Sequence, residues 1–142
     1  MAEDSKKRME EKMIMYQILQ RQLEVYREQM VQLEREMAEI ESTKQTVGDL
    51  KNIKKENSVM IPLGSGLFIE GTITKTKNIL MSPGANMMVE KNFESALDGL
   101  SEKEKQIEKA SRRLQDESGK VAEQLNALTP ELEKLVRESQ EK

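Results

Sequence analysis

Heptad spacing near both ends of the chain constrains its fold more than any other feature of the sequence. In the second half, a stripe of positions runs unbroken from residue 93 to residue 139. It consists of Phe93, Leu97, Leu100, Glu104, Ile107, Ser111, Leu114, Ser118, Val121, Leu125, Leu128, Leu132, Leu135 and Ser139. Alternating steps of four and three keep one stripe of a helix facing a partner helix. We therefore predict a coiled coil, in which this helix pairs with the first half or with another chain.

The first half carries a similar stripe, made of Leu23, Tyr26, Met30, Leu33, Met37, Ile40, Lys44 and Val47. Polar side chains interrupt the two stripes at Lys44, Glu104, Ser111 and Ser118. We interpret them as positions that set the register of the coil at some cost in stability. The alternative is that they loosen the coil so that it can bend.

The start of the chain departs from this regular spacing. The steps are four, three and three along Met9, Met13, Tyr16 and Leu19. Two consecutive steps of three predict a stammer, which overwinds a coil locally. Ile14, Met15 and Ile18 lie off the stripe, so we expect the first turns to be apolar over more of their circumference than pairing requires.

The composition fits a narrow seam better than a thick core. Hydrophobic residues make up 36% of the chain and charged residues 35%, which is poor in apolar and rich in charged residues for a globular domain. The net charge is −3 with the signs interleaved, so we expect no nucleic-acid partner. The longest apolar run is Met13–Tyr16, too short for a membrane span. With no Cys to form disulfides, we expect a soluble cytoplasmic protein without a membrane partner.

The side chains that most enzymes use are poorly supplied. The chain has no His and no Cys, which argues against imidazole bases, thiolate nucleophiles and zinc sites. The glycines of Gly64-Ser65-Gly66 precede a strand pattern and lack the following Lys-Ser/Thr of a phosphate-binding loop. We therefore expect no enzyme activity, no metal and no cofactor.

Residues 53–92 have the alternation of β-strands instead of helical spacing. Gly64-Ser65-Gly66 and Pro83-Gly84-Ala85-Asn86 supply turns, which predicts two β-hairpins in series. Pro62 indicates an edge strand or a bulge. Since single hairpins are marginal in water, we expect these strands to join subunits, although a small sheet packed on the coil is the alternative. The predicted oligomerisation residues are Val59, Ile61, Leu63, Leu67, Ile69, Ile73, Ile79, Met81, Met87 and Val89.

The two heptad segments match in length, so a reversal of the chain in residues 53–92 brings Met9 close to Leu135. Thr129-Pro130 resembles a helix start, but the stripe continues through it, so we expect a kink there and not an end. The apolar surplus at this tip is either a frayed end or an adhesive surface for a nonpolar partner. The residues of that surface are Met9, Met13, Ile14, Met15, Leu128, Leu132, Leu135 and Val136.

The segment Met60–Ile69 resembles the first hairpin of archaeal-type prefoldin alpha subunits. Ile79–Val89, with its Ser82-Pro83-Gly84-Ala85 turn, is similar to the second hairpin, and Glu90–Ala96 is similar to the entry into the second helix. Pro83 stands where the family often has Val. The resemblance implies a single domain of residues 1–142, with helices in 1–52 and 93–142 and two hairpins in 53–92. This fold is mainly α with a small β region: an antiparallel two-helix coiled coil whose hairpins assemble into an inter-subunit β-barrel.

The resemblance also implies a function. Prefoldin is an ATP-independent holdase, in which two alpha and four beta subunits hold unfolded polypeptide at the tips of their coiled coils and pass it to a group II chaperonin. The tip residues named above would then bind clients. The alternative is a structural coiled-coil scaffold that needs specific partners and has no client role.

Overall fold

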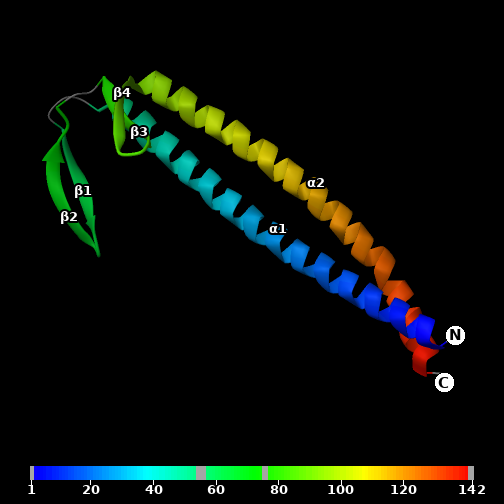
Figure 1. Ribbon diagram of the computed structural model, residues 1–142. Coiled ribbons are helices and arrows are strands. Elements are labelled where there is room, and N and C mark those ends of the chain that lie inside the picture. The colour runs from blue at the N-terminus through cyan, green and yellow to red at the C-terminus, as the bar shows by residue number, and fades with distance from the viewer. Residues whose placement is uncertain (1, 54–56, 75–76, 141–142) are drawn as a thin grey trace. The chain divides into compact units, whose positions relative to one another are not determined.

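The computed structural model describes residues 2–53, 57–74 and 77–140. Two long helices, α1 (Ala2–Lys51) and α2 (Phe93–Gln140), enclose the four strands in the sequence (Figure 1). The strands are β1 (Ser58–Gly64), β2 (Leu67–Thr72), β3 (Asn78–Gly84) and β4 (Met87–Asn92). The chain divides into two compact units: a terminal unit of residues 1–35 and 107–142, and a central unit of residues 36–106. The prediction of two helices and two hairpins is confirmed.

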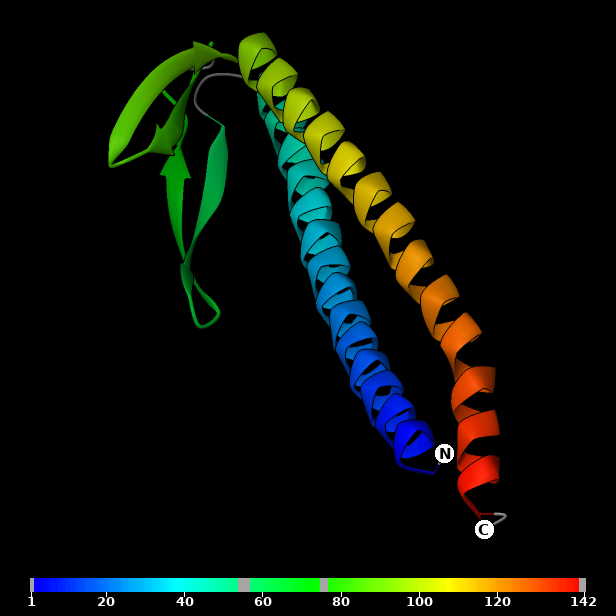
Figure 2. The same ribbon diagram turned by 45° about the vertical axis from the view of Figure 1, so that its right-hand side comes forward.

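In the terminal unit, the start of α1 and the end of α2 lie side by side in both views (Figures 1 and 2). On α1 the inward positions are half-buried at steps of three and four: Met9, Lys12, Tyr16, Leu19, Leu23, Tyr26, Met30 and Leu33. The most buried positions of α2 in this unit are Ile107, Val121, Leu125 and Leu128. Ser111 and Ser118 are half-buried between them. The packing is therefore one narrow seam per helix, as the heptads predict.

The predicted stammer near the start of α1 is wrong. Lys12 takes the seam position and is half-buried, whereas Met13 remains 46% exposed. Lys12 covers the seam with its aliphatic stem, and its ammonium donates to Glu131 Oε2 at 2.5 Å. Because the lysine fits in this way, the alternation of three and four continues without interruption.

The central unit contains the second part of the seam. Val47, Phe93 and Ala96 are buried there. Lys44 and Glu104, both half-buried, form an ion pair of 3.3 Å across the helices. A mispaired register would leave each of these charges without its partner, which supports the register-setting interpretation.

The start of α2 is fixed by a side chain that precedes it. Asn92 Oδ1 accepts a hydrogen bond from the backbone amide of Ser95 at 2.7 Å, which is the geometry of a helix N-cap. At the other end, α2 continues through Pro130 to Gln140. Thr129 does not cap a new helix; its hydroxyl donates to the carbonyl of Leu125 at 2.8 Å, as threonine does inside helices. The prediction that Pro130 does not end the helix is confirmed.

The four strands form two separate antiparallel pairs, β1–β2 and β3–β4, in the described part of the chain. Both turns have positive φ at their two central residues, Ser65-Gly66 and Ala85-Asn86, which is the type I′ pattern. The register shifts between Pro62 and Gly64 and between Met81 and Gly84. The irregularity directly after Pro62 agrees with the prediction of an edge strand or a bulge there.

Ala85 adopts a φ of 50°, which disfavours a side chain without local hydrogen bonding. We expect Ala85→Asn to stabilise the β3–β4 hairpin by about 1 kcal/mol, because asparagine tolerates this region. Ala85→Val should destabilise it, because a β-branched residue is strained there. Amide hydrogen exchange of residues 78–92, followed by mass spectrometry, measures both effects. Equal protection in the three proteins would contradict the turn assignment.

Candidate functional site

Three consecutive apolar side chains of α1 face solvent in the terminal unit. Met13, Ile14 and Met15 are 46%, 57% and 55% exposed. They lie outside the seam because Lys12 and Tyr16 occupy the seam positions on either side of them. Exposure of such a run to water is unfavourable in free energy, and the flexible methionine side chain adapts its shape to different partners. This is the surface that binding of a nonpolar partner would use first.

The other predicted tip residues divide between surface and seam. Val136 on α2 is 40% exposed. Met9, Leu132 and Leu135 are half-buried, and Leu128 is buried. The seam residues therefore hold the two helices together, while Met13, Ile14, Met15 and Val136 are available to a partner.

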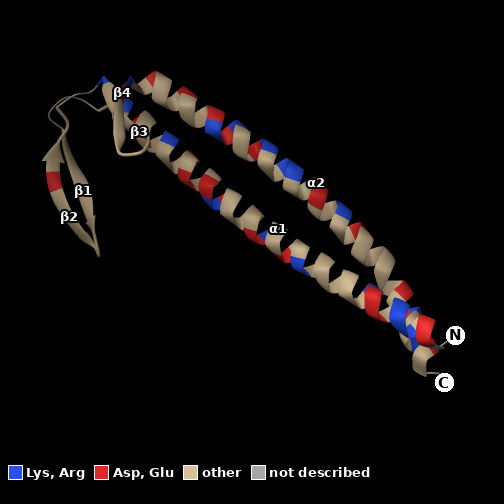
Figure 3. Ribbon diagram, viewed as in Figure 1, with Lys and Arg blue, Asp and Glu red and all other residues tan. Residues whose placement is uncertain are grey.

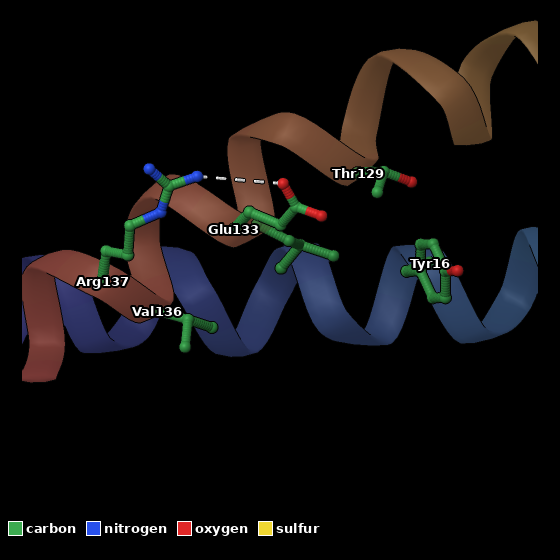
Figure 4. Close-up of a pocket in the computed structure, with 6 residues that line it drawn as sticks. Tyr16, Thr129, Glu133, Val136 and Arg137 are labelled. Carbon is green, nitrogen blue, oxygen red and sulfur yellow. Dashed lines mark ion pairs between the residues drawn. The ribbon is translucent and has the colours of Figure 1, made fainter.

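Two shallow grooves flank the seam of the terminal unit. The first, of about 420 Å³, is drawn in Figure 4, which labels Tyr16 on α1 and Thr129 and Val136 on α2. Its lining consists of Tyr16, Thr129, Leu132, Glu133, Val136 and Arg137, and an ion pair of 3.9 Å joins Arg137 to Glu133 at the rim. The second, of about 430 Å³, is lined by Met15, Leu19, Gln124, Ala127, Leu128 and Glu131. The two share no residue, and their α2 residues occupy opposite flanks of the seam.

Sequence reasoning placed Tyr16 and Leu19 in the stripe and did not assign Thr129 and Ala127 to any surface. Thr129 and Ala127 each lie one position from the seam residue Leu128, and both have small side chains. Small residues next to a seam leave room between two helices, and that spacing was the available signal. Ile18, which was predicted to lie off the stripe, is 60% exposed, one of the largest values for an apolar residue of α1.

A second apolar surface lies on the hairpins. Of the predicted oligomerisation residues, the exposed ones are Ile61, Leu63, Leu67, Ile69, Met87 and Val89. Val59, Ile73, Ile79 and Met81 are half-buried. The sequence analysis missed Met60, Phe68, Leu80 and Met88, all of which are exposed.

The register of β1–β2 places these residues on two faces. Ile61 lies opposite Ile69, whereas Pro62 lies opposite Phe68 on the other face. Glu70 is the one charged residue of this hairpin, in contrast to the charges along both helices (Figure 3). Ser58 Oγ donates to Glu70 at 2.9 Å, and Asn78 Nδ2 donates to Glu90 at 3.1 Å at the equivalent position of β3–β4. The two hairpins are thus built alike, and the first exposes apolar side chains on both faces.

Comparison with known proteins agrees with this architecture. A family model described as prefoldin subunit matches residues 19–138. Prefoldin subunit alpha 1 of Thermococcus kodakarensis is 34% identical over 106 residues, which cover 75% of this chain and 72% of that protein. Prefoldin subunit alpha of Methanococcus aeolicus is 30% identical over 111 residues, which cover 73% and 77%.

Two solved structures support the fold. Filamentous PFD from Methanocaldococcus jannaschii superposes with a TM-score of 0.74 at 22% identity, covering 82% of this chain and 96% of that one. The prefoldin beta subunit from Thermococcus strain KS-1 gives 0.58 at 17% identity, with 92% and 93% covered. In the described residues, neither helix combines the length and the apolarity that a membrane span needs.

Fold and sequence together define a coiled-coil subunit with paired β-hairpins. The chain belongs to the prefoldin family, and its similarity is to the alpha subunits of that family. The predicted resemblance is therefore confirmed.

The assignment of Lys12 to the seam can be tested against the rejected assignment of Met13. Lys12→Met should raise the thermal midpoint of the helices by placing an apolar side chain in the seam, a gain of about 1 kcal/mol. Glu131 loses its partner at little cost because it is 57% exposed. Met13→Lys should change stability by less than about 0.5 kcal/mol, as expected for a surface position. Thermal unfolding followed by circular dichroism distinguishes the two, and a large loss in Met13→Lys would restore the stammer.

Proposed function

We propose that this subunit is part of an ATP-independent holdase that binds unfolded polypeptide through its terminal unit. The observation that carries the proposal is the solvent exposure of Met13, Ile14 and Met15 in a chain that belongs to the prefoldin family. An unfolded client exposes apolar side chains, and contact with these residues removes apolar surface of both partners from water. We further propose a cytoplasmic location, the absence of enzyme activity, and delivery of the client to a group II chaperonin.

Each contact of this kind is weak, because it involves few side chains and no deep pocket. Several coiled coils in one complex act on the same client and raise the effective concentration of the remaining contacts. Such multivalency increases avidity by about 10²-fold or more without any new contact. The same weakness lets single contacts dissociate quickly, so that a client can be released without nucleotide hydrolysis.

Assembly is assigned to the hairpins. An isolated two-stranded hairpin is marginally stable, and its outer edges present unpaired backbone groups. The exposed residues of β1–β2 and β3–β4 would be covered if these strands joined strands of other subunits in a β-barrel. We propose that the partners are prefoldin beta subunits, in a hexamer of two alpha and four beta chains.

The tip assignment predicts the behaviour of a triple variant. Met13→Ser, Ile14→Ser and Val136→Ser together should leave assembly with beta subunits intact but reduce suppression of client aggregation by about tenfold, since interface energy concentrates in a few apolar contacts. The measurement is light scattering of two unrelated unfolded proteins, which also separates a holdase from a scaffold with one specific partner. Val31→Ser is the matched control, because Val31 is 46% exposed and lies away from this patch. Unimpaired holding by the triple variant would rule out the patch as the client site.

The assignment of assembly to the hairpins predicts that a charge on β2 prevents formation of the hexamer. Ile69→Asp places a charge on the exposed apolar face of β2 and should prevent the hexamer from forming, because an unpaired charge cannot be buried. Thr72→Asp is the control, since Thr72 is exposed at the end of the same strand. Native mass spectrometry of the chain mixed with a beta subunit gives the stoichiometry. A full hexamer with Ile69→Asp would show that this face is not an interface.

A further inference from the structure

Charge is segregated on α1 between residues 13 and 33. Between residues 13 and 33, the charged side chains are Arg21, Glu24, Arg27 and Glu28. The seam of α1 has two flanks, and all four charged residues lie on the part of the helix surface that is turned away from one of them. The arc next to that flank is uncharged over five turns, in a chain of which 35% is charged.

The uncharged arc contains a second heptad stripe, which we call the neutral stripe. It consists of Met15, Ile18, Gln22, Val25, Gln29 and Gln32, at steps of three and four. Each of them precedes a seam residue by one position, so that the neutral stripe is rotated from the seam by about 100°. All six are exposed, and the apolar members Met15, Ile18 and Val25 are 55%, 60% and 42% exposed.

The neutral stripe is continuous with the seam. Tyr26 is a seam residue, and its hydroxyl accepts a hydrogen bond of 3.0 Å from Gln22 of the neutral stripe. Next to Met15, the groove of about 430 Å³ lies between α1 and α2, with Ala127 and Leu128 on its α2 side. The small side chain of Ala127 leaves room there for a side chain from a third element. The ion pair between Lys12 and Glu131 bounds the groove at this end.

A helix with one helical neighbour needs only the narrow seam. On α1 the seam and the neutral stripe together form an uncharged arc twice as wide as the seam alone. Heptad spacing in both parts is typical of a helix that packs against two other helices. A strand would not match steps of three and four along six positions. The occupant that this surface fits is therefore another helix.

A second copy of this chain fits the neutral stripe poorly. In an antiparallel pair of stripes, Met15 would face Gln32 and Ile18 would face Gln29, which sets apolar groups against amides. A parallel pair would bury only three apolar side chains from each copy. The area that they bury is far smaller than the roughly 800 Å² per partner of a stable interface. A surface of this size suits a weak and transient partner.

We infer that the neutral stripe binds an amphipathic helical segment of the client, which packs along α1 as a third helix. This inference rests on the proposed holdase function and names the class of segment that the terminal unit prefers. The client helix contributes apolar residues at steps of three and four, one of which enters the groove beside Ala127. The apolar residues of the client helix contact Met15, Ile18 and Val25, and its polar residues face the glutamines, so the binding selects helical periodicity and not a particular sequence.

Two fluorescent peptides of identical composition test the inference on the full chain assembled with beta subunits. One has a heptad apolar stripe and forms a helix; the other has the same residues in an order that destroys the stripe. Fluorescence anisotropy should show the helical peptide binding about tenfold more tightly, as a few anchors dominate such contacts. The double variant Ile18→Glu and Val25→Glu should lose this preference, whereas Val31→Glu on the charged arc should keep it. Circular dichroism of each variant verifies that the coil is intact.

The outcomes separate this inference from the proposed function. Equal binding of the two peptides, or an unchanged preference in the double variant, would contradict helix binding at the neutral stripe and leave the proposed client holding unaffected. Equal loss in Val31→Glu also overturns it, because the effect would then be one of charge alone. If neither peptide binds and the wild-type complex does not suppress client aggregation, both proposals fall.

Discussion

The rest of the structure depends on a single narrow seam between two helices. Along α1 its apolar positions are half-buried except for Val47, and the other buried apolar side chains of the described residues all come from α2. A seam of this kind consumes two positions of every seven and leaves the others in water. The grooves of the described residues are shallow, so the surfaces that the seam leaves uncovered are the candidate functional sites.

Those surfaces follow from which residues the seam excludes. Because Lys12 occupies the seam with its stem and pairs with Glu131, Met13, Ile14 and Met15 turn toward solvent. The neutral stripe arises in the same way, since its residues sit one position ahead of those that face α2. The hairpins repeat the principle with strand periodicity, since pairing of two strands leaves apolar side chains exposed on both faces of β1–β2. Each of these surfaces is small, which suits assembly and client capture through several weak contacts at once.

Much of this fold could be predicted from sequence because coil and hairpins are local patterns. The steps of three and four located both helices, and the glycine turns located both hairpins. The prediction of a stammer failed because hydrophobicity ranks Met13 above Lys12, whereas the structure places the lysine at the seam position with its ammonium on Glu131. Periodicity alone cannot see that cross-helix partner.

The candidate site was predicted only in part. The exposed residues Met13, Ile14, Met15 and Val136 were named in advance, but the grooves were not, since they depend on how Thr129 and Ala127 of one helix meet Tyr16, Met15 and Leu19 of the other. Shape between two elements is not encoded in either element alone. The second face of the first hairpin was missed for a different reason: the predicted oligomerisation residues followed one set of alternating positions, and Met60 and Phe68 belong to the other set.

The central claim is that the two ends of the chain pack as one antiparallel seam. The chain has no native cysteine, so spin labels can be attached at Glu11→Cys and Lys134→Cys, both of which are exposed positions. Pulsed electron–electron double resonance then measures the distance between these two labels. Packed helices have axes about 8–10 Å apart, so with the label linkers we expect a narrow distribution below about 30 Å. A broad distribution centred beyond about 50 Å would contradict the seam, and the surfaces derived from it would no longer follow.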